Sequence, residues 1–324
     1  MPHCISIRPI HPDAIALLNA TPGVTAEVLD DISPASLAAN LPRADALIVR
    51  TIRIDRPFLA MCPNLRLLAR HGVGYDMVDV PALTERGIPL TITPEANAVS
   101  VAEHALMMML ACARRLPAFN DNMRVPRWGA LPGLPTFDLA GKTVLVVGFG
   151  RIGTRVAKLC AAFGMRVLVR DPNIGKGSIR GLGFEPVEDA ADAAGAADIV
   201  TLHCPSNGQT RGMVDAAFLA RMKPGAVLVN TARGTLVDQA ALEVALRAGH
   251  LAAAGLDVFE EEPVETPIPL LDAPNLIMTP HVAASTQEGL RRMAMDSAAA
   301  VIACFEGRLD PDIVVNGEVL ARRN

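Results

Sequence analysis

The stretch TVLVVGFGRIGTRVAKLCAAFG, residues 143–164, decides the fold. Its first five residues are apolar or β-branched, which predicts a buried strand over residues 143–147. The pattern over residues 152–163 predicts a helix, and Gly164 is placed to end it. A strand that leads through a glycine-rich turn directly into a helix is the opening unit of a doubly wound parallel sheet.

The turn itself, Gly148-Phe-Gly-Arg-Ile-Gly153, has the glycine spacing of a dinucleotide-binding loop. Gly148 permits the tight turn, Gly150 lets the backbone approach a pyrophosphate, and Gly153 lets helix and strand pack closely. The first N–H groups of the helix then stabilise the phosphate charge. An ordinary strand-turn-helix without a ligand is the alternative interpretation of the glycines alone.

Asp171 favours the binding interpretation, because it follows the next predicted strand, residues 166–169. A carboxylate about 20 residues after the glycines can accept hydrogen bonds from the ribose hydroxyls of the cofactor, and it would repel a 2′-phosphate. Arg170 is either solvated on the opposite face of the strand or able to reach such a phosphate. We therefore expect NAD as the cofactor, with NADP not excluded.

Short apolar runs separated by helical patterns extend on both sides of this unit, which predicts parallel sheets covered on both faces. The runs before residue 95 are 5–7, 26–29, 46–49, 65–68 and 90–92, and those that follow the glycine unit are 166–169, 199–202, 227–230, 252–256 and 276–278. The fold class is therefore α/β with two domains. We predict a Rossmann domain at residues 99–285, inserted into a smaller flavodoxin-like substrate-binding domain at residues 1–98 and 286–324.

A helix predicted at residues 100–116 is apolar on nearly every side, with Ser100 as its expected N-cap and Glu103 completing a capping box. Such a helix lies in an interdomain core, packs against a second subunit, or does both. We expect a homodimer on this basis.

Composition excludes several classes of partner. The net charge of −4 and the sequence pI near 6.0 do not suit a nucleic-acid-binding protein. The longest apolar run, residues 105–113, is about half of what a membrane span requires, and the start of the sequence does not resemble a signal peptide. The six cysteines are scattered, without metal-ligand spacing. These features predict a cytoplasmic protein without a metal, whose partners are small molecules.

Three later segments place polar residues directly after apolar strands: residues 230–234 with Arg233, residues 257–263 with Glu262, and residues 280–284 with His281. Since the carboxyl ends of parallel strands face one crevice, these side chains are expected to converge. Together with residues 72–76, 97–103 and 202–205, the three segments resemble the D-isomer-specific 2-hydroxyacid dehydrogenase family over nearly the whole chain.

The resemblance implies a reversible hydride transfer between nicotinamide and a small 2-hydroxy or 2-keto acid. Arg233, Glu262 and His281 would be its catalytic residues, and Asp257 would contact the nicotinamide. The substrate would be held by Arg50, Arg233 and the backbone of Val73 and Gly74. The residues expected to hold the cofactor are Gly148, Gly150, Arg151, Ile152, Gly153, Asp171, Cys204, Pro205, Thr210, Thr231, Ala232, Asp257 and Ala283.

Elementary chemistry agrees with these roles. An imidazole such as that of His281 can give and take a proton at neutral pH, and a carboxylate at position 262 would orient the ring and favour its protonated form. A guanidinium at position 233 can grip a carboxylate with two hydrogen bonds while polarising the adjacent carbonyl. Glu260, Glu261 and Glu262 also fit an ordinary solvated acidic run. We expect Cys204 to pack near the cofactor, His203 to shape its loop, and His3, His11, His104 and His250 to be structural.

Two alternatives remain open at this point. D-3-phosphoglycerate dehydrogenases belong to the same family, and Arg50 or Arg70 could hold a remote phosphate, although each could equally make a structural ion pair. Corepressors related to the family bind NAD chiefly as protein-interaction modules, and fold alone does not exclude that role. The residues Glu95, Arg170 and Ala283-Ala284 depart from the commoner family pattern, which affects substrate identity and cofactor preference.

Overall fold

A parallel seven-stranded sheet is built around the strand that opens the glycine-rich stretch. In the computed structural model, which describes residues 1–124 and 135–321, the strand order is β12-β11-β10-β9-β6-β7-β8. The strands are β6 (Thr143–Val147), β7 (Arg166–Arg170), β8 (Glu185–Pro186), β9 (Ile199–Leu202), β10 (Ala226–Asn230), β11 (Leu251–Leu256) and β12 (Leu276–Met278). The chain order reverses between β6 and β9, which is the switch point of a doubly wound sheet.

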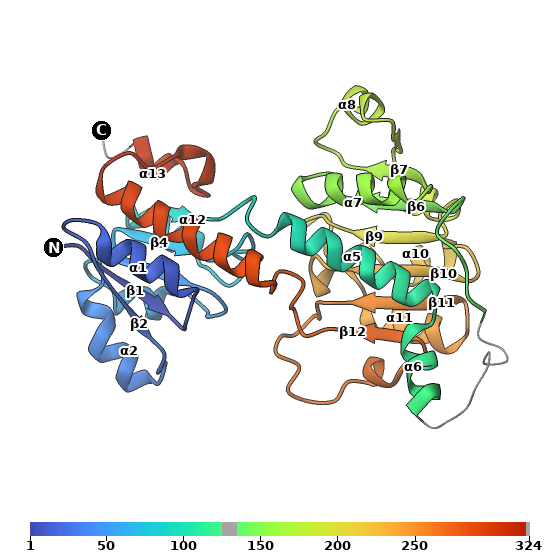
Figure 1. Ribbon diagram of the computed structural model, residues 1–324, viewed down its shortest axis with the longest axis horizontal. Helices are drawn as coiled ribbons and strands as arrows, with labels where there is room; N and C mark the ends of the chain where they lie inside the picture. The colour runs from blue at the N-terminus through green and yellow to red at the C-terminus, as the bar shows by residue number, and fades with distance from the viewer. Residues whose placement is uncertain (125–134, 322–324) are drawn as a thin grey trace. The chain divides into compact units, whose positions relative to one another are not determined.

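Alternate residues of β6 belong to different cores, because successive strand side chains point to opposite faces. Val144 and Val146 pack in a core that receives helices α5 (Ala98–Ala113) and α7 (Arg151–Ala162), while Leu145 and Val147 pack in a second core. That second core receives α9 (Ala190–Ala194), α10 (Ala216–Arg221) and α11 (Gln239–Arg247). Helices therefore cover both faces of the sheet, as Figure 1 shows for α5 and α7 on one of them.

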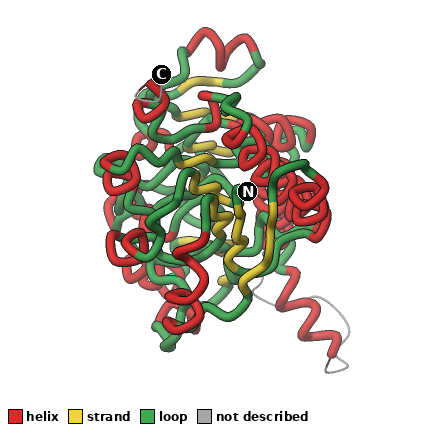
Figure 2. The backbone as a smooth tube through the Cα atoms, turned by 90° about the vertical axis from the view of Figure 1, so that its left-hand side faces the viewer, coloured by secondary structure: helices red, strands yellow, loops and turns green. Residues whose placement is uncertain are grey.

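The chain divides into two units, one formed by Met1–Asn97 with Ser285–Asn324 and the other by Ala98–Ala284. Each boundary lies one residue from the one predicted from the sequence. The last three residues of the predicted first domain lie outside the described residues. The sheets of both units are parallel, and Figure 2 draws their strands in yellow and the helices in red.

The first unit contains a five-stranded sheet of order β2-β1-β3-β4-β5, which is the flavodoxin-like order. Its strands are β1 (His3–Ile7), β2 (Thr25–Leu29), β3 (Ala46–Val49), β4 (Leu67–Arg70) and β5 (Leu90–Thr91). Its helices are α1 (Pro12–Ala20), α2 (Pro34–Asn40), α3 (Arg56–Ala60), α4 (Val80–Glu85), α12 (Gln287–Phe305) and α13 (Glu318–Ala321). Helix α12 packs on α1 and β4, so the segment after residue 284 completes this unit. The predicted α/β fold class is confirmed.

Three details differ from the sequence prediction. Helix α5 begins at Ala98, so Ser100 is a buried residue inside the first turn and not its N-cap. The two-residue strand β8 was not predicted, because it is short and lies at the edge of the sheet beside β7. The strand predicted at 65–68 is observed as Leu67–Arg70. Apolarity alone fixes an element boundary poorly, since Leu65 is buried without belonging to the strand.

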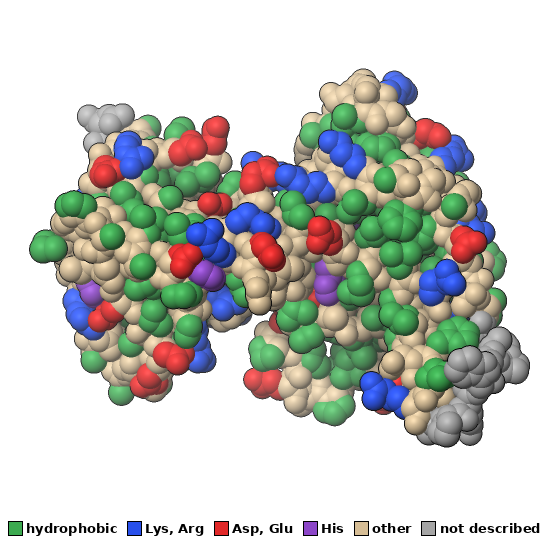
Figure 3. Space-filling view, viewed as in Figure 1, with side chains coloured by type: hydrophobic (Ala, Val, Ile, Leu, Met, Phe, Trp, Pro, Cys, Tyr) green, Lys and Arg blue, Asp and Glu red, His purple; other side chains and the backbone are tan. Residues whose placement is uncertain are grey.

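The remaining α-helices described in the second unit are α6 (Leu116–Arg124) and α8 (Lys176–Gly181). Within the described residues, short 3-10 helices occur at Leu41–Arg43 and Pro311–Ile313 of the first unit and at Gly234–Leu236 and Pro269–Asp272 of the second. Among the described helices, none is long and apolar enough to cross a membrane. Acidic and basic side chains are interspersed over the face drawn in Figure 3.

Candidate active site

The glycine-rich turn between β6 and α7 is tightly packed at two of its three glycines. Gly148 has a φ of 95°, which residues with side chains rarely adopt, and a Cβ there would lie 2.5 Å from the backbone N of Cys204. A Cβ on Gly153 would lie 1.9 Å from the carbonyl oxygen of Gly148. A Cβ on Gly150 would meet no atom of the described residues within 4 Å. A side chain at position 148 or 153 would therefore collide with the protein backbone. The space beside Gly150 is open, and a phosphate group fits there.

Asp171 follows β7 directly and ties the end of this strand to the glycine turn. Its Oδ2 accepts the N–H of Phe149 at 2.7 Å, and its Oδ1 accepts the N–H of Asn173 at 2.8 Å. Each carboxylate oxygen has a second lone pair, so the group can still accept hydrogen bonds from a ligand. Asp171 thus has a structural role in addition to the one predicted from the sequence.

A cavity of about 360 Å³ lies beside Asp171. Its walls combine apolar side chains with both signs of charge, and the lining residues are Arg170, Asp171, Pro172, Ile174, Gly175, Lys176, Ile179, Pro186, Val187 and Glu188. Lys176 forms an ion pair with Glu188 across this lining. Apolar walls with a few polar groups are what a nucleoside requires of its site. The residues of this cavity other than Arg170 and Asp171 were not predicted from the sequence.

The loop after β9 contains the predicted residues Cys204, Pro205 and Thr210. Burial raises the pKa of Cys204 to about 11, so its thiol stays protonated and does not act as a nucleophile at neutral pH. Burial also lowers the pKa of His203 to about 3, and its Nε2 lies 2.8 Å from the Thr201 hydroxyl. The Thr210 hydroxyl donates to the carbonyl oxygen of Pro205 at 2.6 Å. These groups shape the loop and hold no proton that could be exchanged near pH 7.

The turn after β10 carries Thr231, Ala232 and Arg233, and the buried side chain of Asn230 fixes its shape. Asn230 Oδ1 accepts the N–H of Ala232 at 3.0 Å, and Nδ2 donates to the carbonyl oxygen of Arg233 at 2.8 Å. The buried hydroxyl of Thr231 has no hydrogen-bond partner within the described parts of the chain. An unpaired buried hydroxyl at the carboxyl end of a central strand is a group that a bound ligand can satisfy.

Arg233 is brought close to the loop that carries Glu262 by the glycine that follows it. A Cβ on Gly234 would lie 1.9 Å from the carbonyl carbon of Phe259 and 2.5 Å from the N of Glu260. Only a residue without a side chain therefore permits this contact between the two loops. The positive charge of Arg233 is among the influences that lower the pKa of the Glu262 carboxyl.

Glu262 and His281 form the most direct contact of the site. Nδ1 of His281 lies 2.5 Å from Oε2 of Glu262, and the N–H of Phe259 donates to Oε1 of Glu262 at 2.9 Å. Because an ionised carboxylate only accepts hydrogen bonds, the proton of this contact belongs to Nδ1. The imidazole is half exposed, with a side-chain exposure of 49%. Its Nε2 is then the nitrogen that can exchange a proton with a substrate.

The ionisation of Glu262 follows from competing effects. Burial raises the pKa of its carboxyl, but the hydrogen bonds from His281 and from the Phe259 amide lower it, as do the charges of His281 and Arg233. The net result is a pKa below the ordinary value of a glutamic acid. Glu262 therefore stays charged throughout the neutral range and keeps the His281 ring oriented.

Asp257 holds the backbone around His281 in an unfavourable conformation. His281 has a φ of 53°, and a residue with a side chain in this region costs about 1–3 kcal/mol. The N–H of His281 donates to the carbonyl oxygen of Asp257 at 2.8 Å, and the N–H groups of Val282 and Ala283 donate to its carboxylate at 2.9 Å each. The Thr279 hydroxyl donates to the same carboxylate at 2.5 Å. Asp257 and Ala283, both predicted to hold the cofactor, are thus joined by a hydrogen bond.

The other predicted substrate residues, Arg50, Val73 and Gly74, belong to the first unit. Arg70 shapes the loop that contains Val73, because its Nε donates to the carbonyl oxygen of Gly74 at 2.7 Å and its guanidinium donates to that of His71 at 2.5 Å. Arg50 makes a longer hydrogen bond of 3.3 Å to the carbonyl oxygen of Pro9. Of the two arginines considered for a phosphate, Arg70 therefore has the firmer structural role.

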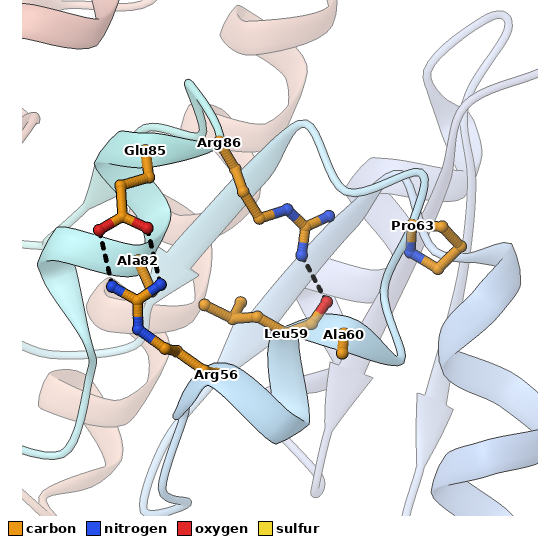
Figure 4. Close-up of a pocket in the computed structure, with 7 residues that line it drawn as sticks. All are labelled: Arg56, Leu59, Ala60, Pro63, Ala82, Glu85 and Arg86. Carbon is orange, nitrogen blue, oxygen red and sulfur yellow. Dashed lines mark hydrogen bonds and ion pairs between the residues drawn. The ribbon is translucent and has the colours of Figure 1, made fainter.

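A second cavity of about 370 Å³ lies between α3 and α4 of the first unit (Figure 4). Its charges are satisfied internally, since Arg56 forms two hydrogen bonds of 2.6 Å with Glu85 and Arg86 donates to the carbonyl oxygens of Leu59 and Cys62. The cavity contains none of the residues predicted for the site.

Residues 106–283 match the model of the D-isomer specific 2-hydroxyacid dehydrogenase, NAD binding domain. The D-3-phosphoglycerate dehydrogenase of Mycobacterium tuberculosis is 43% identical over 286 residues, which cover 88% of this chain and 54% of that protein. The glyoxylate reductase of Aeropyrum pernix is 37% identical over 99% of this chain and 98% of its own length. The chain therefore belongs to the D-isomer-specific 2-hydroxyacid dehydrogenase family, whose members are NAD(P)-dependent oxidoreductases acting on CH–OH groups.

Solved structures agree with this assignment. The crystal structure of D-lactate dehydrogenase from Aquifex aeolicus, complexed with NAD and lactic acid, superposes with a TM-score of 0.85 at 26% identity. The match covers 97% of this chain and 99% of that one. The chain spans about half the length of the phosphoglycerate dehydrogenases that it matches.

The open space beside Gly150 leads to a prediction about two neighbouring glycines. We expect Gly150→Ala to leave the thermal midpoint nearly unchanged and to weaken NADH binding about tenfold, because its methyl group occupies the space of a phosphate. Gly153→Ala should instead lower the midpoint by several degrees, since its methyl group collides with the backbone. Calorimetry and NADH fluorescence titration measure both. Equal NADH affinity in Gly150→Ala and wild type would contradict the phosphate site.

Proposed function

We propose that this protein is an NAD-dependent D-2-hydroxyacid dehydrogenase that interconverts a small 2-hydroxy acid and its 2-keto acid. The observation that carries the proposal is the 2.5 Å contact between Nδ1 of His281 and Oε2 of Glu262, with the Arg233 turn packed against the same loop. This arrangement supplies an oriented acid–base group and a cation for a carboxylate in one place. Both are what the reduction of a 2-keto acid requires.

His281 is the acid–base group of the proposed reaction. When the keto acid is reduced, Nε2 of the imidazolium gives a proton to the carbonyl oxygen, and in the reverse direction the neutral ring takes it back. Nδ1 keeps its proton in both states because Glu262 accepts its hydrogen bond. The lowered pKa of Glu262 supports this role, since a charged carboxylate stabilises the imidazolium.

Arg233 is the group that we assign to the substrate carboxylate. A guanidinium offers parallel N–H donors that match a carboxylate, and its charge also stabilises the oxyanion that develops at the neighbouring carbon. We assign Arg50 and the backbone of Val73 and Gly74 to the same substrate. The hydrogen bonds from Arg70 to the carbonyl groups of His71 and Gly74 support this, because they fix the shape of that loop.

The residues of the second unit fit a dinucleotide, judged by three features: the open space beside Gly150, the cavity beside Asp171 and the unpaired hydroxyl of Thr231. We assign the phosphates to the glycine turn, including Arg151 and Ile152, and the adenosine to Asp171. The nicotinamide end is assigned to Thr231, Ala232, Asp257 and Ala283, and the loop of Cys204, Pro205 and Thr210 lines the path between. NADH supplies the hydride when it is bound.

D-3-phosphoglycerate is a second candidate substrate, favoured by the 43% identity to phosphoglycerate dehydrogenases. Its phosphate would need a cation beyond Arg233. Arg50 is a better candidate than Arg70, because among the described residues Arg50 makes a hydrogen bond of 3.3 Å to Pro9, whereas Arg70 makes one of 2.7 Å to its own loop.

Steady-state kinetics with a panel of 2-keto acids, including glyoxylate, pyruvate and 3-phosphohydroxypyruvate, test the proposed activity with NADH and with NADPH. We expect turnover of at least one member with NADH. His281→Asn should lower kcat by about 10²- to 10⁴-fold, the contribution of a general acid, and leave the Kd for NADH unchanged.

The same measurements separate an enzyme from a binding protein. Tight NADH binding by the wild type, with no turnover across the panel, would replace the proposed activity with an NAD-sensing role. Comparable turnover by His281→Asn at neutral pH would remove His281 from the mechanism even if the enzyme were active.

Asp171 and Arg170 give opposite predictions for cofactor choice, because both line the same cavity. Asp171→Ala should weaken NADH about tenfold and NADPH less, since the lost carboxylate repels a 2′-phosphate. Arg170→Ala, the matched control, should leave NADH unchanged and weaken NADPH. Fluorescence titration gives the dissociation constants of both cofactors for wild type and for each variant. An unchanged ratio between the cofactors in Asp171→Ala would mean that the ribose is recognised elsewhere.

We also propose that the protein is a cytoplasmic homodimer. The cysteines form no disulfide bond within the described residues, which supports a reducing compartment. Helices α5 and α6 expose Val99, Met107, Leu116 and Met123, each by more than 40%, and a second copy would cover them. Light scattering should give twice the 34.2 kDa mass of one chain, and Leu116→Glu should shift the protein toward the single-chain mass. A single-chain mass for the wild type at micromolar concentration would contradict the dimer.

A further inference from the structure

We propose that His104 is a positioning residue for His281, acting through the hydroxyl of Thr279 and the carboxylate of Asp257. His104 lies on α5, far in sequence from the residues assigned to the reaction. Its Nε2 lies 3.0 Å from Oγ1 of Thr279 and 3.7 Å from Oδ1 of Asp257. The inference rests on the proposed dehydrogenase activity, because it concerns how the acid–base group of that reaction is held.

Asp257 connects His104 to the backbone around His281. Its side chain is 1% exposed and accepts three hydrogen bonds, from the Thr279 hydroxyl and from the N–H groups of Val282 and Ala283. A buried carboxylate requires such donors, because burial without them is strongly unfavourable. Thr279 precedes His281 in the sequence, and Val282 and Ala283 follow it. The orientation of the Asp257 carboxylate therefore sets the backbone around His281.

The direction of each hydrogen bond follows from the available protons. Asp257 can only accept, so the single hydroxyl proton of Thr279 is used in the 2.5 Å contact with Oδ1. The Thr279 oxygen can then only accept from the ring of His104, which means that Nε2 of His104 carries a proton. His104 thus fixes the rotamer in which the hydroxyl points at Asp257. The result is a directed chain from α5 to the strained turn.

The location of His104 suits this role. Helix α5 packs on β10, β11 and β12, the strands whose ends carry Arg233, Asp257 and His281. The His104 side chain is 15% exposed, so water has little access to the contact with Thr279. A rigid helix can therefore hold the ring in place while the loop around His281 is under backbone strain.

Without His104, the Thr279 hydroxyl loses the donor that fixes its rotamer, and the turn at His281 becomes free to relax. We expect His104→Ala to lower kcat by about 10- to 100-fold, the cost of misplacing a reacting group. The Kd for NADH should change much less than kcat, because the glycine turn and Asp171, to which we assign the phosphates and the adenosine, are not involved. His104→Gln, whose amide nitrogen can donate from nearly the same position, should restore most of kcat.

A matched control is available in the same unit. The ring of His250 also contacts the protein through Nε2, which lies 2.9 Å from the carbonyl oxygen of Leu219, outside the proposed site. His250→Ala should therefore leave kcat unchanged. Thr279→Val, which replaces the hydroxyl by a methyl group, should lower kcat as His104→Ala does, and Thr279→Ser should restore it. The double variant of His104→Ala and Thr279→Val should be no worse than Thr279→Val alone, because the two residues act in one chain.

Amide hydrogen exchange provides a readout that does not depend on activity. In the wild type, the N–H groups of Val282 and Ala283 should exchange slowly, because Asp257 accepts both. In His104→Ala they should exchange at least tenfold faster, while amides of β6 stay unchanged. A general loss of stability would instead accelerate both sets.

The outcomes distinguish this inference from the proposed function. If wild type is active and His104→Ala keeps full kcat and slow exchange at positions 282 and 283, the inference is wrong and the activity stands. If no keto acid is turned over, the proposed function fails, while faster exchange in His104→Ala would still support the hydrogen-bond chain. Additive effects of the two substitutions on kcat would contradict a shared chain.

Discussion

The structure of the candidate site depends on one contact, the hydrogen bond from Nδ1 of His281 to the carboxylate of Glu262. Two strand ends must meet for this contact to form, because Glu262 follows β11 and His281 follows β12. The parallel pairing of these strands brings both loops to the same edge of the sheet. The fold therefore orients the ring, and the carboxylate defines which nitrogen is left to exchange a proton.

Close backbone contacts make this arrangement specific. Gly234 lies against the peptide group of Phe259, and Gly153 lies against the carbonyl of Gly148, so a side chain at either position would force the loops apart. The remaining glycine of the turn, Gly150, faces open space within the described residues. Glycine thus has two different roles in the site: at positions 153 and 234 it allows the chain to pack closely, and at position 150 it leaves room for a ligand.

The sequence predicted the parallel strands and the doubly wound class of the sheet well, because both follow from the apolar runs and the glycine turn. It also predicted that Arg233, Glu262 and His281 follow strands that end at one edge. The hydrogen bonds of Asp257 to the 279–283 segment could not be predicted, since they depend on a left-handed backbone at His281. His104 was assigned a structural role because nothing in its own helix indicates Thr279 as its partner. Asn230 could have been recognised, because an Asn at a strand end commonly bonds to the turn that follows.

The most direct test of the account is a crystal structure with NAD and oxamate, an unreactive analogue of a 2-keto acid. The account predicts that Nε2 of His281 lies within hydrogen-bonding distance of the amide carbonyl oxygen of oxamate, about 2.6–3.2 Å. The guanidinium of Arg233 should hold the carboxylate with two hydrogen bonds, and the nicotinamide should face the same carbon. An analogue bound with its carbonyl oxygen turned away from His281, or held without Arg233, would contradict the account.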